Sequence, residues 1–320
     1  MNFNNKNIWI ITDGSQGMIS QVRGLAQEFS KKIYSIKTEL YFPWSLIQPG
    51  FLPIFKWIFK NKINFSNKPE IIITCGRKSV YLSLYLKKKL SNKVITIHIQ
   101  NPKFNISKFD YIIAPKHDNL SGKNVIESIG AIHKFGNTET LDKDYFNISF
   151  SKKNLVTILI GGKNRHYDFN EKIILYLTKK IIKLKNDNSK INIIVITSRR
   201  TGSKINALLQ SYLNKIAYVW DGKNNNPYSF SLINSKHFIV TSDSTSMISE
   251  CASTGKPIYI FHLPFKRKSR RMEEFHEEFA NRKITKKFID NTVLEDWKYE
   301  TFNEAKRISG ILKERIIKGL

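Results

Sequence analysis

Hydroxyl and carboxylate side chains are concentrated in residues 236–263 of the 320-residue chain, where they could bind a phosphorylated ligand. The polar turn of this stretch contains Ser242, Asp243, Ser244 and Ser246. Residues 238–241 before the turn are typical of a buried parallel strand, and Gly255 after it ends a short helix. Such a strand-to-helix turn leaves unpaired N–H groups at the carboxyl edge of a sheet, a ready site for phosphate. Glu250 lies inside the helix, where it could reach ribose hydroxyls; a capped helix with a solvated glutamate is the alternative.

The same order of elements resembles a known nucleotide site. A strand, a Ser/Thr-rich turn, a glutamate and then Gly255-Lys256-Pro257 are similar to the donor site of two-domain GT-B glycosyltransferases. In that superfamily the glutamate binds the donor ribose and the turn lies near the phosphates. The resemblance implies that Glu250 contacts ribose and that residues 242–246 contact phosphate or sugar.

Two further polar turns follow apolar runs in the second half of the chain. Residues 155–160 and 191–197 read as strands, and each leads into glycines, hydroxyls or basic side chains. The turn residues expected to contact the ligand are Gly161, Gly162, Arg165, Ser198, Arg199 and Arg200. An arginine guanidinium matches phosphate bidentately, so Arg199 or Arg200 could clamp a diphosphate. Three such turns at one sheet edge predict an anion site.

The first half of the chain has a similar plan. Strands at 8–12, 69–74, 94–99 and 111–114 alternate with helices, which predicts a parallel, doubly wound sheet. Polar residues follow these strands, where such folds place ligands, and those expected to contact substrate are Asp13, Gly14, Arg77, Gln100, Asn101 and His117. Asp13 either caps the following helix or acts as a general base on an acceptor hydroxyl. His98 lies within an apolar strand and is expected to be a core histidine.

The predicted fold class is α/β, with two doubly wound Rossmann-like domains facing a cleft, as in GT-B proteins. A polar segment with little periodicity lies between residues 136 and 154. We therefore expect an acceptor domain over residues 1–145 and a sugar-nucleotide domain over residues 146–320, with the last helix packing back on the first domain.

Composition limits the class of partner. The 41% hydrophobic content excludes a disordered protein, and the net charge of +27 favours anionic partners. The chain shows no zinc-ligand spacing and no nucleic-acid-binding motif, so nucleic acid is not an expected partner. Cys75 and Cys251 lie in apolar segments and are expected to be buried free thiols. Without a signal peptide or an apolar stretch long enough to span a bilayer, the chain is expected to be cytoplasmic.

Residues 41–62 are rich in aromatic side chains and end in basic residues. Their sequence is YFPWSLIQPGFLPIFKWIFKNK, in which three prolines prevent one long helix. Aromatic and lysine side chains together suit an interfacial membrane surface, so peripheral contact with an anionic inner membrane is one interpretation. A loop packed on the core of the first domain is the other.

Nearly the whole chain resembles one known family. The matching segments are, in order, TDGSQGM, TCGR, HIQNP with FDYIIAPKHD, GKNVIESIGAIHK, LIGGKNRHY, TSRRT, WDGKNNNPY, VTSDSTSMISECASTGKP and RRMEEFH. They are similar to the mitochondrial-fission "elongated mitochondria" family, which contains a plant fission factor and bacterial homologues. The family is GT-B-like, and its bacterial members are often labelled nucleoside-diphosphate-sugar epimerases. The resemblance implies a sugar-nucleotide site; the fission role belongs to the plant member.

We therefore expect a metal-independent GT-B glycosyltransferase of bacterial envelope glycan synthesis, with a nucleotide sugar as substrate and no cofactor. The acceptor would be a glycan or glycolipid, and Asp13 the base. One departure affects Asp13: many metal-independent relatives place a histidine in the first glycine loop, and this loop has none. The alternatives are a nucleoside-diphosphate-sugar epimerase, a non-catalytic membrane-associated scaffold and a nucleic-acid binder.

Overall fold

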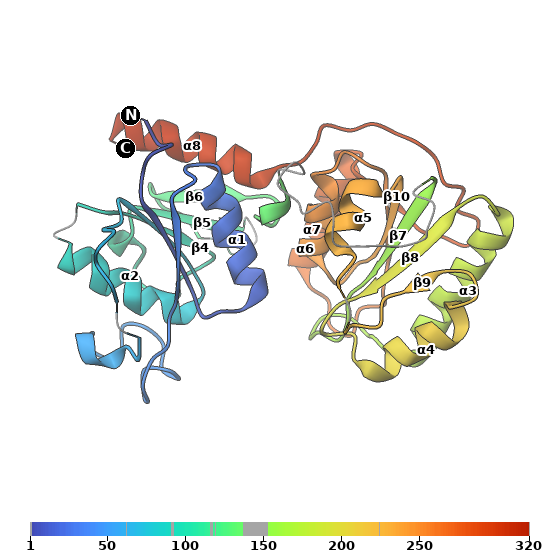
Figure 1. Cartoon of the computed structure of the whole chain (residues 1–320), viewed down its shortest axis with the longest axis horizontal. Coiled ribbons are helices and arrows are strands. Elements are labelled where there is room, and N and C mark those ends of the chain that lie inside the picture. The colour runs from blue at the N-terminus through green and yellow to red at the C-terminus, as the bar shows by residue number, and fades with distance from the viewer. Residues whose placement is uncertain are drawn as a thin grey trace. The chain divides into compact units, whose positions relative to one another are not determined.

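The chain folds into two compact α/β units, each built on one six-stranded sheet with helices packed against it (Figure 1). The structure, a computed structural model, describes residues 2–61, 63–90, 93–115, 118, 120–136, 153–223 and 225–319. The first unit comprises Met1–Gly136 together with Asn303–Leu320, and the second comprises Asn137–Phe302.

The sheet of the first unit is entirely parallel. Its strands lie in the order β2-β1-β3-β4-β5-β6. They are β1 (Ile8–Thr12), β2 (Ile33–Lys37), β3 (Ile71–Cys75), β4 (Ile95–Ile99), β5 (Tyr111–Pro115) and β6 (Val125–Ser128). The α-helices are α1 (Gln16–Gln27), α2 (Arg77–Lys89) and α8 (Glu304–Lys318). Every residue of β1 and β3 is buried, because a parallel strand between two helical layers is covered on both faces.

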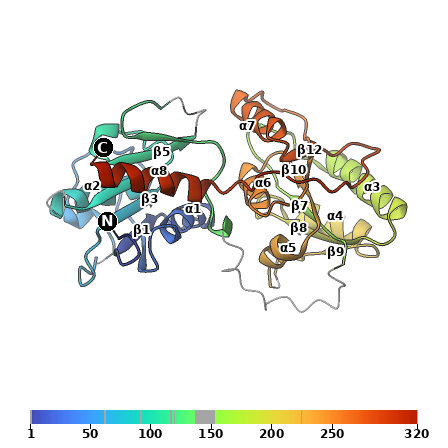
Figure 2. The same ribbon diagram turned by 90° about the horizontal axis from the view of Figure 1, so that it is seen from above.

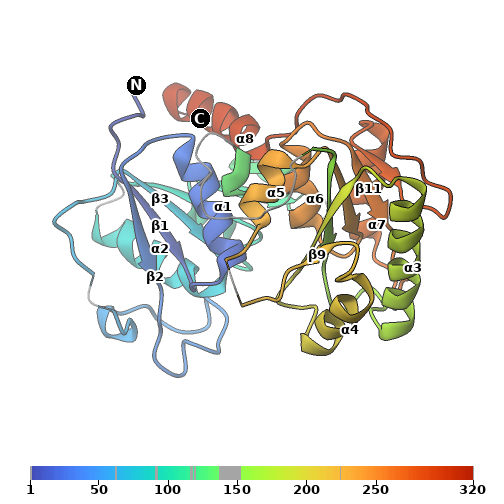
Figure 3. The ribbon, with the colours of Figure 1, turned by 45° about the vertical axis from the view of Figure 1, so that its right-hand side comes forward.

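The sheet of the second unit is also parallel. Its strands lie in the order β12-β11-β10-β7-β8-β9. They are β7 (Leu155–Ile160), β8 (Asn192–Thr197), β9 (Tyr218–Val219), β10 (His237–Thr241), β11 (Ile258–Phe261) and β12 (Thr285–Lys287). The helices are α3 (Glu171–Asp187), α4 (Ser203–Leu213), α5 (Tyr228–Asn234), α6 (Thr245–Ala252) and α7 (Arg270–Asn281). Figures 2 and 3 show α3 and α4 on one side of this sheet and α5 and α6 on the other.

Each sheet contains one point where the strand order reverses. In the first unit the chain runs outward from β1 to β2 and from β3 to β6, so the reversal lies between β1 and β3. In the second unit it lies between β7 and β10. At such a point neighbouring strands send their connections to opposite faces, and the crevice left at their carboxyl ends is where doubly wound folds bind ligands. The observed sheets confirm the predicted α/β class with two doubly wound, parallel sheets.

The last helix completes the core of the first unit. Asn303 caps α8, and the buried Ile308 and Leu312 join the apolar cluster that includes α1. The Glu304 carboxylate accepts a hydrogen bond of 2.8 Å from the backbone N–H of Ile129 and pairs with Arg307. The C-terminal segment therefore contributes both apolar and polar contacts to this unit.

The cysteines and His98 are core residues, as the sequence indicated. Cys75 and Cys251 are buried and free. His98 is 1% exposed, its Nδ1 lies 2.7 Å from the Thr74 hydroxyl, and its ring packs on Phe109. Among the described residues, no helix combines the length and apolarity needed to cross a bilayer.

We expect His98 to make the protein sensitive to acid. Burial lowers the pKa of His98 to about 3. The unfolded chain binds a proton at this histidine near pH 6.5, which the folded chain does not bind until about pH 3, so stability falls as the pH falls through this window. At pH 4.5 the loss is about 2 to 3 kcal/mol.

Urea unfolding of the protein and of His98→Leu between pH 7 and pH 4.5 measures this effect. The variant should lose about 2 to 3 kcal/mol less unfolding free energy over that range, since leucine does not titrate. Identical pH slopes for the two proteins would contradict the assignment.

Candidate functional site

One buried carboxylate joins three turns at the carboxyl edge of the second sheet. The Asp243 side chain is 0% exposed. It accepts hydrogen bonds from the Gly162 N–H and the Arg200 guanidinium, both at 2.9 Å, and from the Thr241 hydroxyl at 2.7 Å. The same hydroxyl accepts from the Gly161 N–H at 2.8 Å. The turns after β7, β8 and β10 are thereby brought together.

The two glycines after β7 are required by this close packing. A Cβ on Gly161 would lie 2.1 Å from a carboxylate oxygen of Asp243, and one on Gly162 would lie 2.2 Å from the Arg200 carbonyl carbon. The Arg200 guanidinium also donates to the Gly162 carbonyl oxygen at 3.2 Å. Gly161, Gly162, Arg200 and Asp243 thus form the frame of the site.

The start of α6 presents backbone donors at the reversal point. Its N-cap, Ser244, makes no side-chain cap hydrogen bond, whereas Asn170 and Asn303 cap α3 and α8 with their side chains. Ser246 in the first turn is exposed. A helix start without a side-chain cap keeps its N–H groups and positive dipole end available to an anion. Ser242 differs, because it is fully buried and its hydroxyl accepts from the Leu263 N–H.

Glu250 lies further along α6 and is 9% exposed. The Tyr228 hydroxyl, from the start of α5, donates a hydrogen bond to its carboxylate. Burial and the nearby Glu250 charge raise the pKa of Tyr228 well above its usual value, so the phenol remains a donor. A carboxylate has about four acceptor positions, so the Tyr228 hydroxyl occupies one of several. Sequence reasoning missed Tyr228, because nothing local ties it to a residue 22 positions away.

Basic side chains gather around His166, in the loop that follows β7. Burial and the charges of Arg165, Arg271 and Arg267 together lower the pKa of His166. Arg165 and Arg267 are exposed. The cluster adds positive charge near the first polar turn. In the sequence the basic run KRKSRR at 266–271 is the signal for this cluster.

Arg199 and Ser198 belong to a neighbouring hollow. They line a pocket of about 500 Å³ with residues of α4 and with Trp220 and Asp221 after β9. Both arginines are exposed, but only Arg200 is paired with Asp243. Of the two arginines, Arg199 has the side chain that the frame does not engage.

The predicted residues of the first unit that the structure describes follow the carboxyl ends of β1, β3 and β4. An Asp13 carboxylate oxygen accepts from the Ser15 N–H at 3.0 Å, within the turn before α1. Gly14 adopts φ +94°, which favours glycine, and its N–H donates to the Thr12 hydroxyl. Asp13 therefore stabilises a turn at the reversal point between β1 and β3.

The remaining predicted residues of this unit have local partners. The Arg77 guanidinium donates to the carbonyl oxygens of residues 45, 46 and 47 at 2.5 to 2.6 Å. The Gln100 side chain donates to Gln21, and Asn101 accepts from the Lys103 N–H. His117 lies outside the described residues. Arg77 thus anchors the 41–62 segment, a role that the sequence did not predict.

Within the described part of the chain, His, Cys, Asp and Glu side chains form no group of three placed to hold a metal ion.

Solved structures share the fold over almost the whole chain. A UDP-GlcNAc 2-epimerase from Methanocaldococcus jannaschii is 13% identical, with a TM-score of 0.56 over 96% of this chain and 99% of that one. The UDP-GlcNAc 2-epimerase from Neisseria meningitidis is 12% identical, with a TM-score of 0.54 over 98% and 100%. At these identities the similarity shows the fold alone, which is of the GT-B type.

Two protein sequences and a family model identify the chain's relatives. An uncharacterised protein of Rickettsia prowazekii, RP120, is 30% identical over 96% of this chain and 98% of its own length. The mitochondrial fission protein ELM1 of Arabidopsis thaliana is 25% identical over 78% of this chain, which spans 65% of the plant protein. The model of the family described as mitochondrial fission ELM1 matches residues 16–316. This confirms the resemblance noted from the sequence: the chain belongs to the mitochondrial fission ELM1 family.

Proposed function

We propose that the second unit binds a nucleotide-activated sugar and that the protein transfers the glycosyl group to a glycan or glycolipid acceptor of the bacterial envelope. The observation that carries this proposal is the Asp243 frame, which gathers three turns at the reversal point of the sheet. Next to this frame α6 begins without a side-chain cap, and Glu250 lies further along the same helix.

Each part of the nucleotide has a matching group. The diphosphate lies at the N–H groups of the first turn of α6, with charge supplied by Arg165, Arg267 and Arg199. Its ribose hydroxyls donate to the Glu250 carboxylate, which Tyr228 holds in place. The ligand is thus bound by backbone N–H donors, guanidinium groups and one carboxylate.

Transfer then proceeds by displacement at the anomeric carbon. The acceptor oxygen forms the new bond as the bond to the diphosphate breaks, and the electron pair leaves with the diphosphate. Asp13 takes the acceptor proton. The helix dipole and the arginines stabilise the charge that develops on the leaving group. An epimerase would use the same donor site without an acceptor, and an epimeric nucleotide sugar formed without acceptor would favour it.

Peripheral contact with an anionic membrane is part of the proposal. In the described part of the 41–62 segment, six large apolar or aromatic side chains are exposed: Phe51 by 78%, Phe42 by 77%, Leu46 by 72%, Trp57 by 59%, Tyr41 by 50% and Phe55 by 47%. The segment is held underneath by Trp44, which is buried, packs edge-on against Trp57 and donates to the Pro53 carbonyl oxygen. Exposed aromatic groups on an anchored loop, with Lys56 and Lys60 beside them, fit the headgroup region of an anionic bilayer.

Thermal unfolding with UDP-, GDP-, dTDP-, ADP- and CMP-sugars tests the donor site. UDP-GlcNAc comes first, because the Neisseria protein of the same fold was crystallised with it. At one hundred times its dissociation constant the right ligand should add about 2.7 kcal/mol to stability. Glu250→Gln should weaken binding about tenfold or more, because hydrogen bonds to a charged group contribute about 1.5 to 3 kcal/mol.

Glu171→Gln, at the start of α3, is the matched control and should bind like the natural protein. A shift that survives Glu250→Gln unchanged, or no shift with any nucleotide sugar, would refute the donor site.

Vesicle sedimentation tests the membrane contact. The double variant Leu46→Ser, Phe51→Ser should bind vesicles of anionic phosphatidylglycerol at least about tenfold more weakly, because burying one such side chain contributes about 1.5 to 3 kcal/mol. The control, Ile289→Ser with Val293→Ser, removes exposed apolar groups of the second unit. Equal loss in both variants would rule out a specific surface. Vesicle binding without nucleotide-sugar binding would favour the scaffold.

A further inference from the structure

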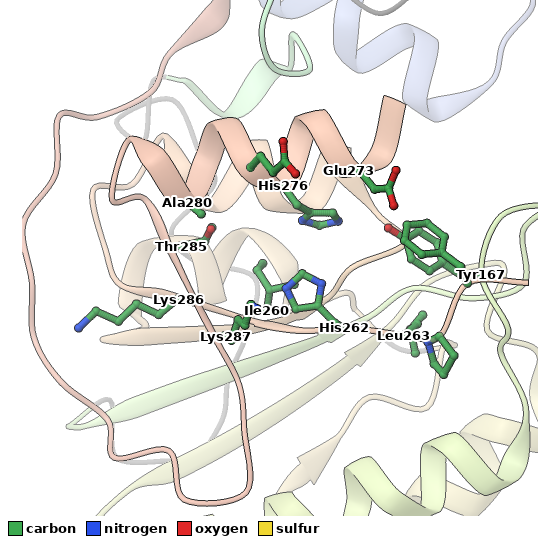
Figure 4. Close-up of a pocket in the computed structure, with 13 residues that line it drawn as sticks. Tyr167, Ile260, His262, Leu263, Glu273, His276, Ala280, Thr285, Lys286 and Lys287 are labelled. Carbon is green, nitrogen blue, oxygen red and sulfur yellow. The ribbon is translucent and has the colours of Figure 1, made fainter. Parts of the chain in front are cut away.

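A second cavity lies in the second unit, between α7 and the strands β11 and β12, with a volume of about 420 Å³ (Figure 4). Polar side chains enter it from three directions. Glu273 and His276 come from α7, His262 comes from the end of β11, and Tyr167 comes from the loop after β7. None of these four residues takes part in the nucleotide site proposed above.

The walls of this cavity are held by regular backbone pairing. Residues 166–168 and 264–267 are bonded to each other: the Asp168 N–H donates to the Pro264 carbonyl oxygen at 2.8 Å, and the Lys266 N–H donates to the His166 carbonyl oxygen at 2.9 Å. The Tyr167 ring stacks on Phe265, with centroids 4.6 Å apart. The cavity is therefore a built feature of the unit.

His276 presents a hydrogen-bond acceptor inside the cavity. Its Nε2 lies 2.8 Å from the Ser242 carbonyl oxygen, and a carbonyl can only accept, so Nε2 carries the proton. Burial, followed by His262, lowers the pKa of His276 to about 4, so the ring is neutral near pH 7. Nδ1 therefore has a free lone pair. It is buried, and no described residue bonds to it.

Tyr167 adds a second polar atom. The residue is 2% exposed, and its hydroxyl faces Ser242 without reaching hydrogen-bonding geometry with any described residue. Burial raises the pKa of Tyr167 to about 12, so the phenol stays protonated. A buried polar atom without a partner is unfavourable, and a ligand that supplies one removes that penalty.

The surroundings define the class of ligand. His262 and His276 meet edge to face, with ring centroids 5.2 Å apart, and Ile260, Leu263 and Phe265 supply apolar wall. One ligand hydroxyl can donate to Nδ1 of His276, and another can donate to the Glu273 carboxylate. The Glu273 carboxylate disfavours the binding of an anion, and Lys286 and Lys287 of β12 disfavour the binding of a cation. A neutral ring with several hydroxyl groups and an apolar C–H face can hydrogen-bond to the polar side chains of the cavity and pack against its apolar side chains.

We propose that this cavity is a carbohydrate subsite, which binds a neutral, monosaccharide-sized ring with a ligand hydroxyl donating to Nδ1 of His276. The His276–Ser242 hydrogen bond links it to the turn at 242–246. The subsite rests on the proposed function and refines it, because it would hold either the glycosyl group of the donor or the sugar of the acceptor.

Histidine side-chain ¹H–¹⁵N spectra of the full chain test the proposal. The probes are methyl β-glucopyranoside, UDP-GlcNAc and UDP. We expect the Nδ1 resonance of His276 to shift with the glycoside if the ring belongs to an acceptor, or with UDP-GlcNAc but not UDP if it belongs to the donor. His237, on β10, bonds to the Glu295 carbonyl oxygen and is the internal reference that should not move.

Two substitutions distinguish the proposed ligand contact at Nδ1 of His276 from the structural hydrogen bond between its Nε2 and the Ser242 carbonyl oxygen. His276→Gln keeps a donor near the Nε2 position but removes the Nδ1 acceptor, so it should weaken sugar binding about tenfold and leave UDP binding unchanged. His276→Asn keeps an acceptor near the Nδ1 position and should retain more binding.

A third substitution covers the case in which the His276 variants fail to fold. Ala280→Leu fills the cavity from the exposed side of α7 and should abolish sugar binding, while Asn281→Leu beside it should not. The proposal is overturned if neither sugar probe moves His276 beyond the effect of UDP, or if Ala280→Leu binds sugar normally. UDP binding that persists in either case leaves the nucleotide site standing.

Discussion

The second unit depends on the burial of one charge. The Asp243 carboxylate has no exposed surface, and a buried carboxylate is tolerated only when its lone pairs are satisfied. The turns after β7 and β8 supply a backbone N–H and a guanidinium, and Thr241, at the end of β10, supplies a hydroxyl. Each donor must sit within hydrogen-bonding distance of one small group, so the turns cannot separate without leaving a buried charge unpaired. Glycine at 161 and 162 is the steric consequence, because any Cβ there would collide with this arrangement.

This constraint divides the polar residues of the edge into two groups. Asp243 and Arg200 are engaged with each other, and the Ser242 hydroxyl is engaged with the backbone. The start of α6, which has no side-chain cap, and the exposed Arg165 and Arg267 lie outside these contacts, and they are the groups that the proposed function assigns to a ligand. In a site of this kind the turns joined by Asp243 are rigid. The groups that would contact a ligand come from the start of α6 and from the side chains around it. Such preorganisation favours binding, because little conformational freedom is lost when the ligand arrives.

The strands and the edge at which the polar turns meet could be predicted from the sequence. Short β-branched runs ending in glycine or hydroxyl residues indicate buried parallel strands, and parallel strands bring their carboxyl ends to one edge. The partner of each side chain could not be predicted, since that depends on distances between turns. Arg77 donates to the carbonyl oxygens of 45–47 and Arg200 to Asp243, partners that no local pattern indicates, and the expected substrate contact of both stays a prediction. Tyr228 and the cavity at His276 were missed for the same reason, because each depends on helix packing that brings distant residues together.

Hydrogen–deuterium exchange with UDP-GlcNAc measures the central claim most directly, because the proposed phosphate contacts are backbone N–H groups. We predict slower exchange at the amides of 245–247 at the start of α6, with smaller protection in the framed turns at 161–165 and 198–201. The amides at the start of α3, which Asn170 already caps, should be unchanged. Saturating ligand that leaves 245–247 unprotected while protecting another part of the chain would contradict the account.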